Sequence, residues 1–208
     1  MKVESLIFDI DGTLWDCRAV VAEGYNAVLR REGLEHLCVD AEILKAQFGK
    51  VMTDIADDLF ASVPAGERYA LLDRCMAEED RCLEEATVDM GYPKVKEVLT
   101  ELAKKYRLFI VSNGQKGYCD LCEGKLGLTE LIEGHLCFGD TGTEKGLTIL
   151  KLMKDHHISS AVYVGDTQGD YAATVVAGLP FVYCAYGFGT PERYDYKLES
   201  FEDLLSIF

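Results

Sequence analysis

The distribution of hydrophobic and polar positions predicts strands that alternate with helices. Four short runs of aliphatic and aromatic residues stand out, at residues 6–10, 108–111, 161–164 and 181–185. Apolar runs of this length with few polar interruptions are typical of parallel strands covered on both faces. A weaker apolar stretch at residues 135–138 predicts one more strand.

Segments of helical length lie between these runs. Their apolar positions recur at helical spacing, and they cover residues 93–106, 117–126, 145–156 and 171–177. Strands that alternate with helices in this way indicate an α/β fold with a doubly wound, mainly parallel sheet of the Rossmann type.

One long segment, residues 17–89, interrupts the alternation. It contains successive helical patterns without a convincing strand, at residues 19–31, 41–48, 53–60 and 66–85. The glycine and proline of Gly91-Tyr92-Pro93 punctuate the return to the α/β pattern. We therefore predict an α/β domain formed by residues 1–16 and 90–208, and an inserted helical domain formed by residues 17–89.

Charge and composition exclude several classes of partner. The chain has 208 residues, 49% of them hydrophobic, with 21 Lys and Arg against 36 Asp and Glu, which gives a formal net charge of −15. Such a surface repels nucleic acid and acidic lipid headgroups, so we expect neither partner. No apolar run approaches the ~20 residues that span a bilayer, and no signal peptide is visible. The eight cysteines therefore indicate reduced thiols in the cytoplasm.

Polar side chains follow three of the apolar runs. The first run leads into Asp9 and Asp11 at its end, Ser112-Asn113-Gly114 follows the second, and Asp166 with Asp170 follows the third. The carboxyl ends of parallel strands share one edge of the sheet, where ligands bind, so these side chains are expected to converge. Several acids at one point require a cation, and hard oxygen ligands suit Mg²⁺.

The ordered set of motifs resembles that of the haloacid dehalogenase (HAD) superfamily. The resemblance covers the α/β domain and rests on residues 9–14 (DIDGTL), Asp16, Ser112-Asn113, Lys145, and Gly165-Asp166 with Asp170. It implies a Rossmann-like core with an inserted helical cap. Two further stretches, Phe48-Gly49-Lys50 and Ala185-Tyr186-Gly187-Phe188-Gly189, resemble phosphoglycolate phosphatases and their relatives.

The resemblance also implies a role for each acid. Asp9 attacks phosphorus to form an aspartyl-phosphate. Asp11 donates a proton to the leaving alcohol and then accepts one from the attacking water. Asp9, the backbone carbonyl of Asp11 and the side chain of Asp166 hold Mg²⁺, and Asp170 supports the metal shell or Lys145.

The remaining implied site residues bind the phosphoryl group or the substrate. Lys145 offsets charge on the phosphoryl oxygens; because Gly146 follows it where the family usually has proline, Lys116 is the alternative. The hydroxyl of Ser112 and the N–H of Asn113 donate to the same oxygens. The other expected substrate contacts are Gly12, Thr13, Gly114 and, in the helical insert, Lys50.

These residues predict a Mg²⁺-dependent phosphatase that hydrolyses a small phosphorylated metabolite. A phosphomutase of the β-phosphoglucomutase type shares the core motifs and is the first alternative. A non-enzymatic binding module is the second, since fold alone does not fix function. A dehalogenase is disfavoured because halide-displacing relatives lack an aspartate at the position of Asp11. The sequence leaves the substrate undecided, and likewise the choice between monomer and homodimer.

Overall fold

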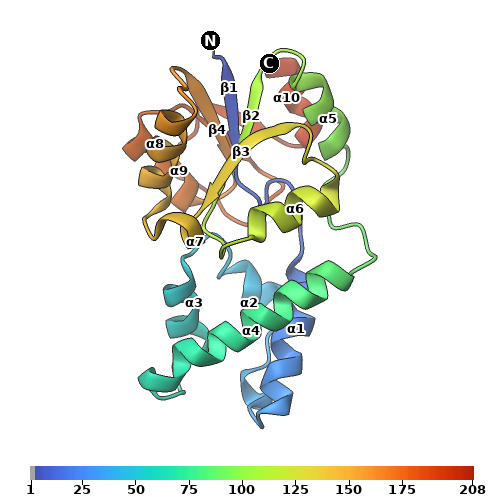
Figure 1. Ribbon diagram of the computed structural model, residues 1–208, viewed down its shortest axis with the longest axis vertical. Helices are drawn as coiled ribbons and strands as arrows, with labels where there is room; N and C mark the ends of the chain where they lie inside the picture. Colours follow the sequence, from blue (N-terminus) through green and yellow to red (C-terminus); the bar gives the residue numbers. More distant parts are fainter. Residues whose placement is uncertain (1–2) are drawn as a thin grey trace. The chain divides into compact units, whose positions relative to one another are not determined.

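The computed structural model describes residues 3–208 and divides them into two compact units (Figure 1). The α/β unit consists of residues 3–16 together with Gly91–Phe208, and the helical unit is Cys17–Met90. The helical unit ends at Met90, one residue after the expected boundary at residue 89. Within residues 3–208, none of the helices combines the length and the apolar composition needed to cross a bilayer.

A parallel sheet forms the centre of the α/β unit. Its strands are β1 (Ser5–Phe8), β2 (Arg107–Ser112), β3 (Ile132–Cys137), β4 (Ala161–Gly165), β5 (Phe181–Cys184) and β6 (Tyr196–Leu198). The strand order is β3-β2-β1-β4-β5-β6, and every neighbouring pair is parallel. This confirms the predicted doubly wound α/β fold.

Helices cover both faces of this sheet. They are α5 (Val95–Leu102), α6 (Tyr118–Leu126), α7 (Phe138–Thr141), α8 (Lys145–Asp155), α9 (Gln168–Ala177) and α10 (Leu204–Ile207), with a 3₁₀ turn η2 (Phe201–Asp203) before the last. Helices α8 and α9 lie on one side of the sheet, and α5 and α10 lie on the other (Figure 1).

The hydrophobic runs form the core because both faces of their strands are covered. Every residue of β1, β4 and β5 is buried. Ile7, Phe109 and Tyr163 from three adjacent strands pack with Ile149 and Leu152 of α8 in one cluster. Burial of each such side chain contributes about 1.5–3 kcal/mol to the free energy of unfolding. Because these side chains hold the strands in place, the positions of the strand ends are fixed as well.

The strand order places a topological switch beside β1. From β1 the chain crosses to β2 and β3 on one side, and then returns to β4, β5 and β6 on the other. β1 is hydrogen-bonded to both β2 and β4. Ligands bind at such switch points, beyond the carboxyl ends of the strands. Asp9, Ser112 and Asp166 stand at the ends of these three adjacent strands.

The helical unit packs without a sheet. Its elements are α1 (Arg18–Arg31), a 3₁₀ turn η1 (Glu35–Leu37), α2 (Ala41–Lys45), α3 (Met52–Leu59) and α4 (Ala65–Glu85). Helices α1 and α4 approach closely at Gly24, where an added Cβ would lie 3.0 Å from the backbone of Glu79. The long helix α4 therefore packs directly on α1, which gives the unit its own core.

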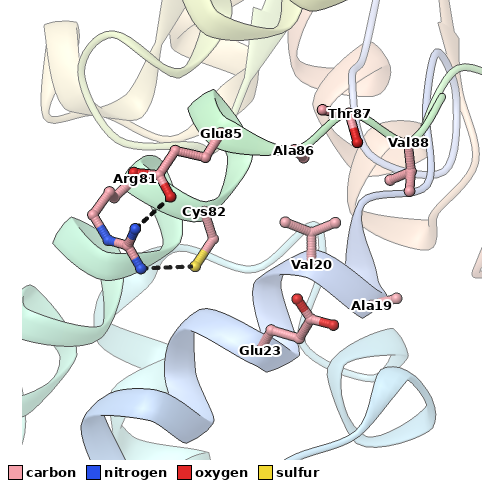
Figure 2. Close-up of a pocket in the computed structure, with 9 residues that line it drawn as sticks. All are labelled: Ala19, Val20, Glu23, Arg81, Cys82, Glu85, Ala86, Thr87 and Val88. Atoms are coloured by element: carbon pink, nitrogen blue, oxygen red, sulfur yellow. Dashed lines mark hydrogen bonds and ion pairs between the residues drawn. The ribbon is translucent and has the colours of Figure 1, made fainter.

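A hollow of about 450 Å³ lies between α1 and the end of α4 (Figure 2). Arg81 in its wall is hydrogen-bonded to Glu85 and Glu78, and much of the remaining wall is small or apolar, including Ala19, Val20 and Ala86. None of the expected site residues lines this hollow.

The structure differs from the sequence pattern mainly at the ends of elements. Residues 135–137 of the weak stretch belong to a longer strand, β3, which starts at Ile132 and ends at Cys137, whereas Phe138 already begins α7. β6 was missed, because a three-residue strand with Lys197 at its centre carries no apolar run. Helix α9 starts three residues earlier than predicted, because Thr167 caps it in a capping box with Asp170.

Candidate active site

Three carboxylates meet at the carboxyl edge of the sheet. Asp9 follows β1, Asp166 follows β4, and Asp170 lies in the first turn of α9. One oxygen from each lies within 4.8 Å of the others. Their exposed fractions are 2%, 0% and 0%. A buried group of acids this dense is unstable without positive charge, so it calls for a cation.

Lys145 supplies one positive charge to this group. Its Nζ donates to Asp9 Oδ1 at 2.8 Å and to Asp170 Oδ1 at 2.7 Å. The lysine is the first residue of α8 and is only 6% exposed. Burial alone would lower the pKa of Lys145, but the two carboxylates outweigh it and hold the pKa well above its usual value. The lysine therefore stays charged.

Asp170 connects Lys145 to the loop before α9. Its Oδ2 accepts hydrogen bonds from the N–H of Asp166 at 3.1 Å, from the N–H of Thr167 at 2.9 Å and from the Thr167 hydroxyl at 2.7 Å. Burial alone would raise the pKa of Asp170, but Lys145 and the bonds from Thr167 overcome it and lower the pKa. Asp170 is thus an anionic anchor with both oxygens in use.

Asp166 has a different environment. Its Oδ2 accepts from the N–H of Phe188 at 2.6 Å, whereas its buried Oδ1 has no hydrogen-bond partner among residues 3–208. Burial, followed by the charges of Asp170 and Asp9, raises the pKa of Asp166 well above its usual value. A buried carboxylate oxygen without a partner is costly, and a bound metal ion would satisfy it.

Two glycines make room for Asp166. An added Cβ at Gly12, where φ is +78°, would lie 2.2 Å from Asp166 Oδ2, and one at Gly187 would lie 2.4 Å from Asp166 Cβ. Any side chain at either position would displace the carboxylate. In the sequence, Gly187 belongs to the stretch 185–189 that resembles phosphoglycolate phosphatases. Its role here, to leave space for Asp166, depends on a contact that the sequence does not reveal.

The electrostatics of Asp9 reflect the excess of acid. Burial raises its pKa to about 7, although Lys145 opposes the shift, and Asp170 and Asp11 add to it. One lysine faces three buried carboxylates here, so one positive charge is too little to balance the acids. Both the orphaned Asp166 oxygen and this charge imbalance fit a divalent cation with hard oxygen ligands.

Asp11 is not part of the acid cluster. Its half-exposed side chain turns instead to two aromatic donors: Trp15 Nε1 donates to Asp11 Oδ1 at 2.9 Å, and Tyr118 Oη donates to the same oxygen at 2.7 Å. Neither Trp15 nor Tyr118 belongs to the motifs on which the predicted site rests. Their contact with Asp11 joins the first loop to α6.

The loop after β2 is built around Ser112 and Gly114. The Ser112 hydroxyl accepts from the N–H of Gly114 at 3.1 Å and is almost completely buried. Gly114 lies against the Tyr118 ring, so close that an added Cβ would lie 2.7 Å from it. Asn113, between them, is half-buried. The expected Ser112-Asn113-Gly114 motif thus ends a strand next to β1.

Thr13 supports the first loop. Its side chain is fully buried, its N–H donates to the carbonyl of Ile10 at 3.1 Å, and its own carbonyl accepts from the Tyr186 hydroxyl at 2.9 Å. These bonds involve backbone groups of Thr13 and hold the turn that carries Asp11 and Gly12.

The two lysines named beside Lys145 lie in other surroundings. Lys116 is exposed. Burial would raise the pKa of Asp140, but hydrogen bonds from Cys137 lower it, and the charge of Lys116 adds a smaller lowering effect. Between Lys145 and its alternative Lys116, Lys145 is the one hydrogen-bonded to the acid cluster. Lys50, in the helical unit, donates to Asp58 at 2.6 Å and Gln47 at 3.2 Å.

The cysteines form no cross-link. All eight lie in the described residues and none of them forms a disulfide, as the composition predicts. Cys119 and Cys122 of α6 are almost completely buried, at 1% and 0% exposed.

Comparisons with known proteins agree with this geometry. A curated phosphoglycolate phosphatase from Xanthomonas campestris is 27% identical over 190 residues, which cover 88% of this chain and 84% of the relative. A solved structure from Haemophilus somnus, described as a predicted phosphoglycolate phosphatase, superposes with a TM-score of 0.87 at 21% identity, covering 100% of this chain and 98% of the other.

A β-phosphoglucomutase structure from Clostridium difficile superposes with a TM-score of 0.79 at 14% identity, covering 98% of this chain and 93% of the other. At such identities the solved structures establish the shared fold alone. The family model described as haloacid dehalogenase-like hydrolase matches residues 6–184. The chain therefore belongs to the haloacid dehalogenase-like hydrolase family.

Proposed function

We propose that this protein is a Mg²⁺-dependent phosphatase that hydrolyses a small phosphomonoester through an aspartyl-phosphate on Asp9. The observation that carries the proposal is the buried group of Asp9, Asp166 and Asp170 around the charged Lys145. The curated relatives named phosphoglycolate phosphatase make phosphoglycolate the first substrate to test.

The residues present fit Mg²⁺. Asp9 and Asp166 would hold the ion together with the backbone carbonyl of Asp11, and the orphaned Asp166 Oδ1 is a ready ligand. Asp170, which the family resemblance assigns to the metal shell or to Lys145, is better assigned to holding Lys145, because both its oxygens already accept hydrogen bonds. When bound, the ion supplies positive charge that lessens the repulsion between an anionic nucleophile and a phosphate.

The proposed chemistry proceeds in two steps. An Asp9 oxygen forms a bond to phosphorus while the bond to the ester oxygen breaks, and Asp11 gives its proton to the leaving alcohol. Water then attacks the phosphorus of the aspartyl-phosphate and gives a proton to Asp11. Inorganic phosphate leaves, and the Asp9 carboxylate is restored.

Other groups of the site bind the transferred phosphoryl. Lys145 places its charge beside Asp9, which suits the equatorial oxygens of a loose phosphoryl transfer. The Ser112 hydroxyl and the Asn113 N–H act as further donors to these oxygens. Gly12, Thr13 and Gly114 contribute through the backbone of the loops that surround the phosphoryl group.

Phosphate release is expected from a panel of small phosphomonoesters in Mg²⁺, and it should stop when a chelator removes the metal. The panel compares phosphoglycolate, sugar phosphates and nucleoside monophosphates. Release that continues undiminished after complete removal of metal would contradict the proposal, as would absence of release from every ester. Interconversion of a sugar phosphate without release would favour a phosphomutase.

The helical unit is proposed to act as a cap that excludes water and contacts the leaving group. Lys50→Ala is expected to change the order of preference among the esters of the panel, because Lys50 is the cationic residue of the Phe48-Gly49-Lys50 motif. Affinity for Mg²⁺ should stay nearly unchanged. Lys45→Ala, at an exposed position of α2, is the control. An identical substrate profile in both variants would assign Lys50 to the surface pair with Asp58 alone.

A further inference from the structure

The carboxylate of Asp11 is held by two donors that the proposed mechanism does not use. Trp15 Nε1 and Tyr118 Oη lie 2.9 and 2.7 Å from the same oxygen, Oδ1. Hydrogen bonds from neutral donors to a carboxylate are charge-assisted and stronger than ordinary ones. We call Asp11, Trp15 and Tyr118 the carboxylate clamp.

Both donors of the clamp are themselves rigid. Trp15 is fully buried and Tyr118 is 3% exposed. Their rings meet edge to face, with centroids 5.7 Å apart and an interplanar angle of 72°. The carbonyl of Trp15 accepts from the N–H of Gly12 at 3.0 Å, which closes the turn that carries Asp11. The indole and the phenol therefore reach Asp11 from fixed positions.

Tyr118 also ties the clamp to the loop after β2. Its ring occupies the space over Gly114, where an added Cβ would lie 2.7 Å from Cδ1. The glycine of the Ser112-Asn113-Gly114 motif thus admits a ring whose hydroxyl contacts Asp11. Residues 107 positions apart in the sequence, Asp11 and Tyr118, are joined at the edge of the site.

We propose that Trp15 and Tyr118 are positioning residues that fix the orientation of the Asp11 carboxyl for proton transfer to the leaving group. This inference rests on the proposed phosphatase function. A carboxyl oxygen has two lone pairs, and both pairs of Oδ1 are used by the clamp. The transferred proton is therefore carried by Oδ2, and the clamp sets the direction in which Oδ2 points.

Satisfaction of buried polar atoms alone does not account for this arrangement. A buried tyrosine hydroxyl or indole N–H needs an acceptor, and for Tyr163, Tyr183 and Tyr186 a single backbone carbonyl serves that purpose. In the clamp, two donors from different elements select one oxygen of one half-exposed acid instead. The result is an orientation of a single functional group.

The test compares Tyr118→Phe with Tyr106→Phe. The first variant keeps the ring over Gly114 and removes only the hydroxyl. The control removes a hydroxyl of the same unit that donates to the backbone oxygen of Phe208 at 3.1 Å, beside the amino end of β2. Rapid-quench kinetics measure phosphorylation of Asp9 from p-nitrophenyl phosphate and from the alkyl phosphate that the wild type hydrolyses fastest.

Tyr118→Phe is expected to slow phosphorylation by the alkyl ester roughly 10- to 100-fold, with little change in KM. The burst with p-nitrophenyl phosphate should stay within about threefold of wild type, because nitrophenolate leaves without a proton. Tyr106→Phe should leave both rates unchanged. Equal losses with both esters, or no loss with either, would overturn the positioning role.

A second readout does not depend on turnover. Trp15 is the only tryptophan in the chain, so its fluorescence reports directly on the clamp. Asp11→Ala and Tyr118→Phe are each expected to shift the emission of the folded protein, and Tyr106→Phe is not. Unchanged emission in both clamp variants would contradict the inference. Wild-type protein that hydrolyses no ester would instead overturn the proposed function itself.

Discussion

Asp9→Asn is expected to abolish phosphoenzyme formation. An amide oxygen is a poor nucleophile, and the proposed metal site loses an anionic ligand with the same substitution. Lys145 would also lose one of its two carboxylate partners, the one at 2.8 Å. The measurement is rapid-quench kinetics with p-nitrophenyl phosphate in saturating Mg²⁺, in which wild-type protein should give a burst and Asp9→Asn none.

Asp11→Asn is the matched comparison for this experiment. It keeps the nucleophile and removes the proton carrier, so turnover should fall by ~10²–10⁴-fold, as is typical of general acid–base catalysis. A burst with p-nitrophenyl phosphate should remain, because that leaving group needs little protonation, and hydrolysis of the phosphoenzyme becomes the slow step. Equal losses without a burst in either variant would contradict the assignment of separate roles to the two aspartates.

Lys145→Met is expected to have the largest effect on stability. The side chain is of similar length, but the charge that faces Asp9 and Asp170 is lost. Removal of one partner from a buried ion pair costs about 3–5 kcal/mol of the free energy of unfolding, because the remaining charges are left uncompensated. Catalysis should fall by at least ~10²-fold, since a preorganised positive charge is lost. Urea denaturation and the phosphate-release assay measure the two effects.

Lys151→Met, on the same helix α8, is the control. Lys151 forms an exposed pair with Asp155, and both side chains are about half accessible to solvent, so its removal should lower the free energy of unfolding far less than removal of Lys145. Added Mg²⁺ should restore part of the stability of Lys145→Met, because a cation at Asp9 and Asp166 offsets the excess acid. Similar stability losses in the two variants, or no response to Mg²⁺, would argue against the proposed electrostatic role of Lys145.

The strands of the α/β unit were predictable because burial on both faces leaves a direct mark on the sequence. A strand covered on both sides must be apolar throughout. The apolar runs that start at Leu6, Leu108, Ala161 and Phe181 therefore predict β1, β2, β4 and β5. β3 and β6 lie at the two edges of the sheet. Edge strands are partly exposed and admit polar residues, so β3 was only partly visible and β6 was not.

The residue types of the acid cluster were equally readable. Asp9 and Asp166 directly follow apolar runs, and parallel topology brings such strand ends to one edge. The sequence did not decide whether Asp170 binds the metal or holds Lys145. That distinction depends on both oxygens of Asp170 being in use. Thr167 binds one of them in the capping box of α9, and Lys145 reaches the other because α8 packs beside α9.

The sequence by itself determined the fold class and the acids at the strand ends, because hydrophobic periodicity and strand topology are local patterns with a global consequence. Only the tertiary structure decided which groups from distant parts of the chain touch these acids. Tyr118 reaches Asp11 across 107 positions, and Gly187 leaves space for Asp166. Such contacts depend on how closely distant segments pack, where one added methyl group would cause a clash. The spacing of residues along the chain does not encode these distances.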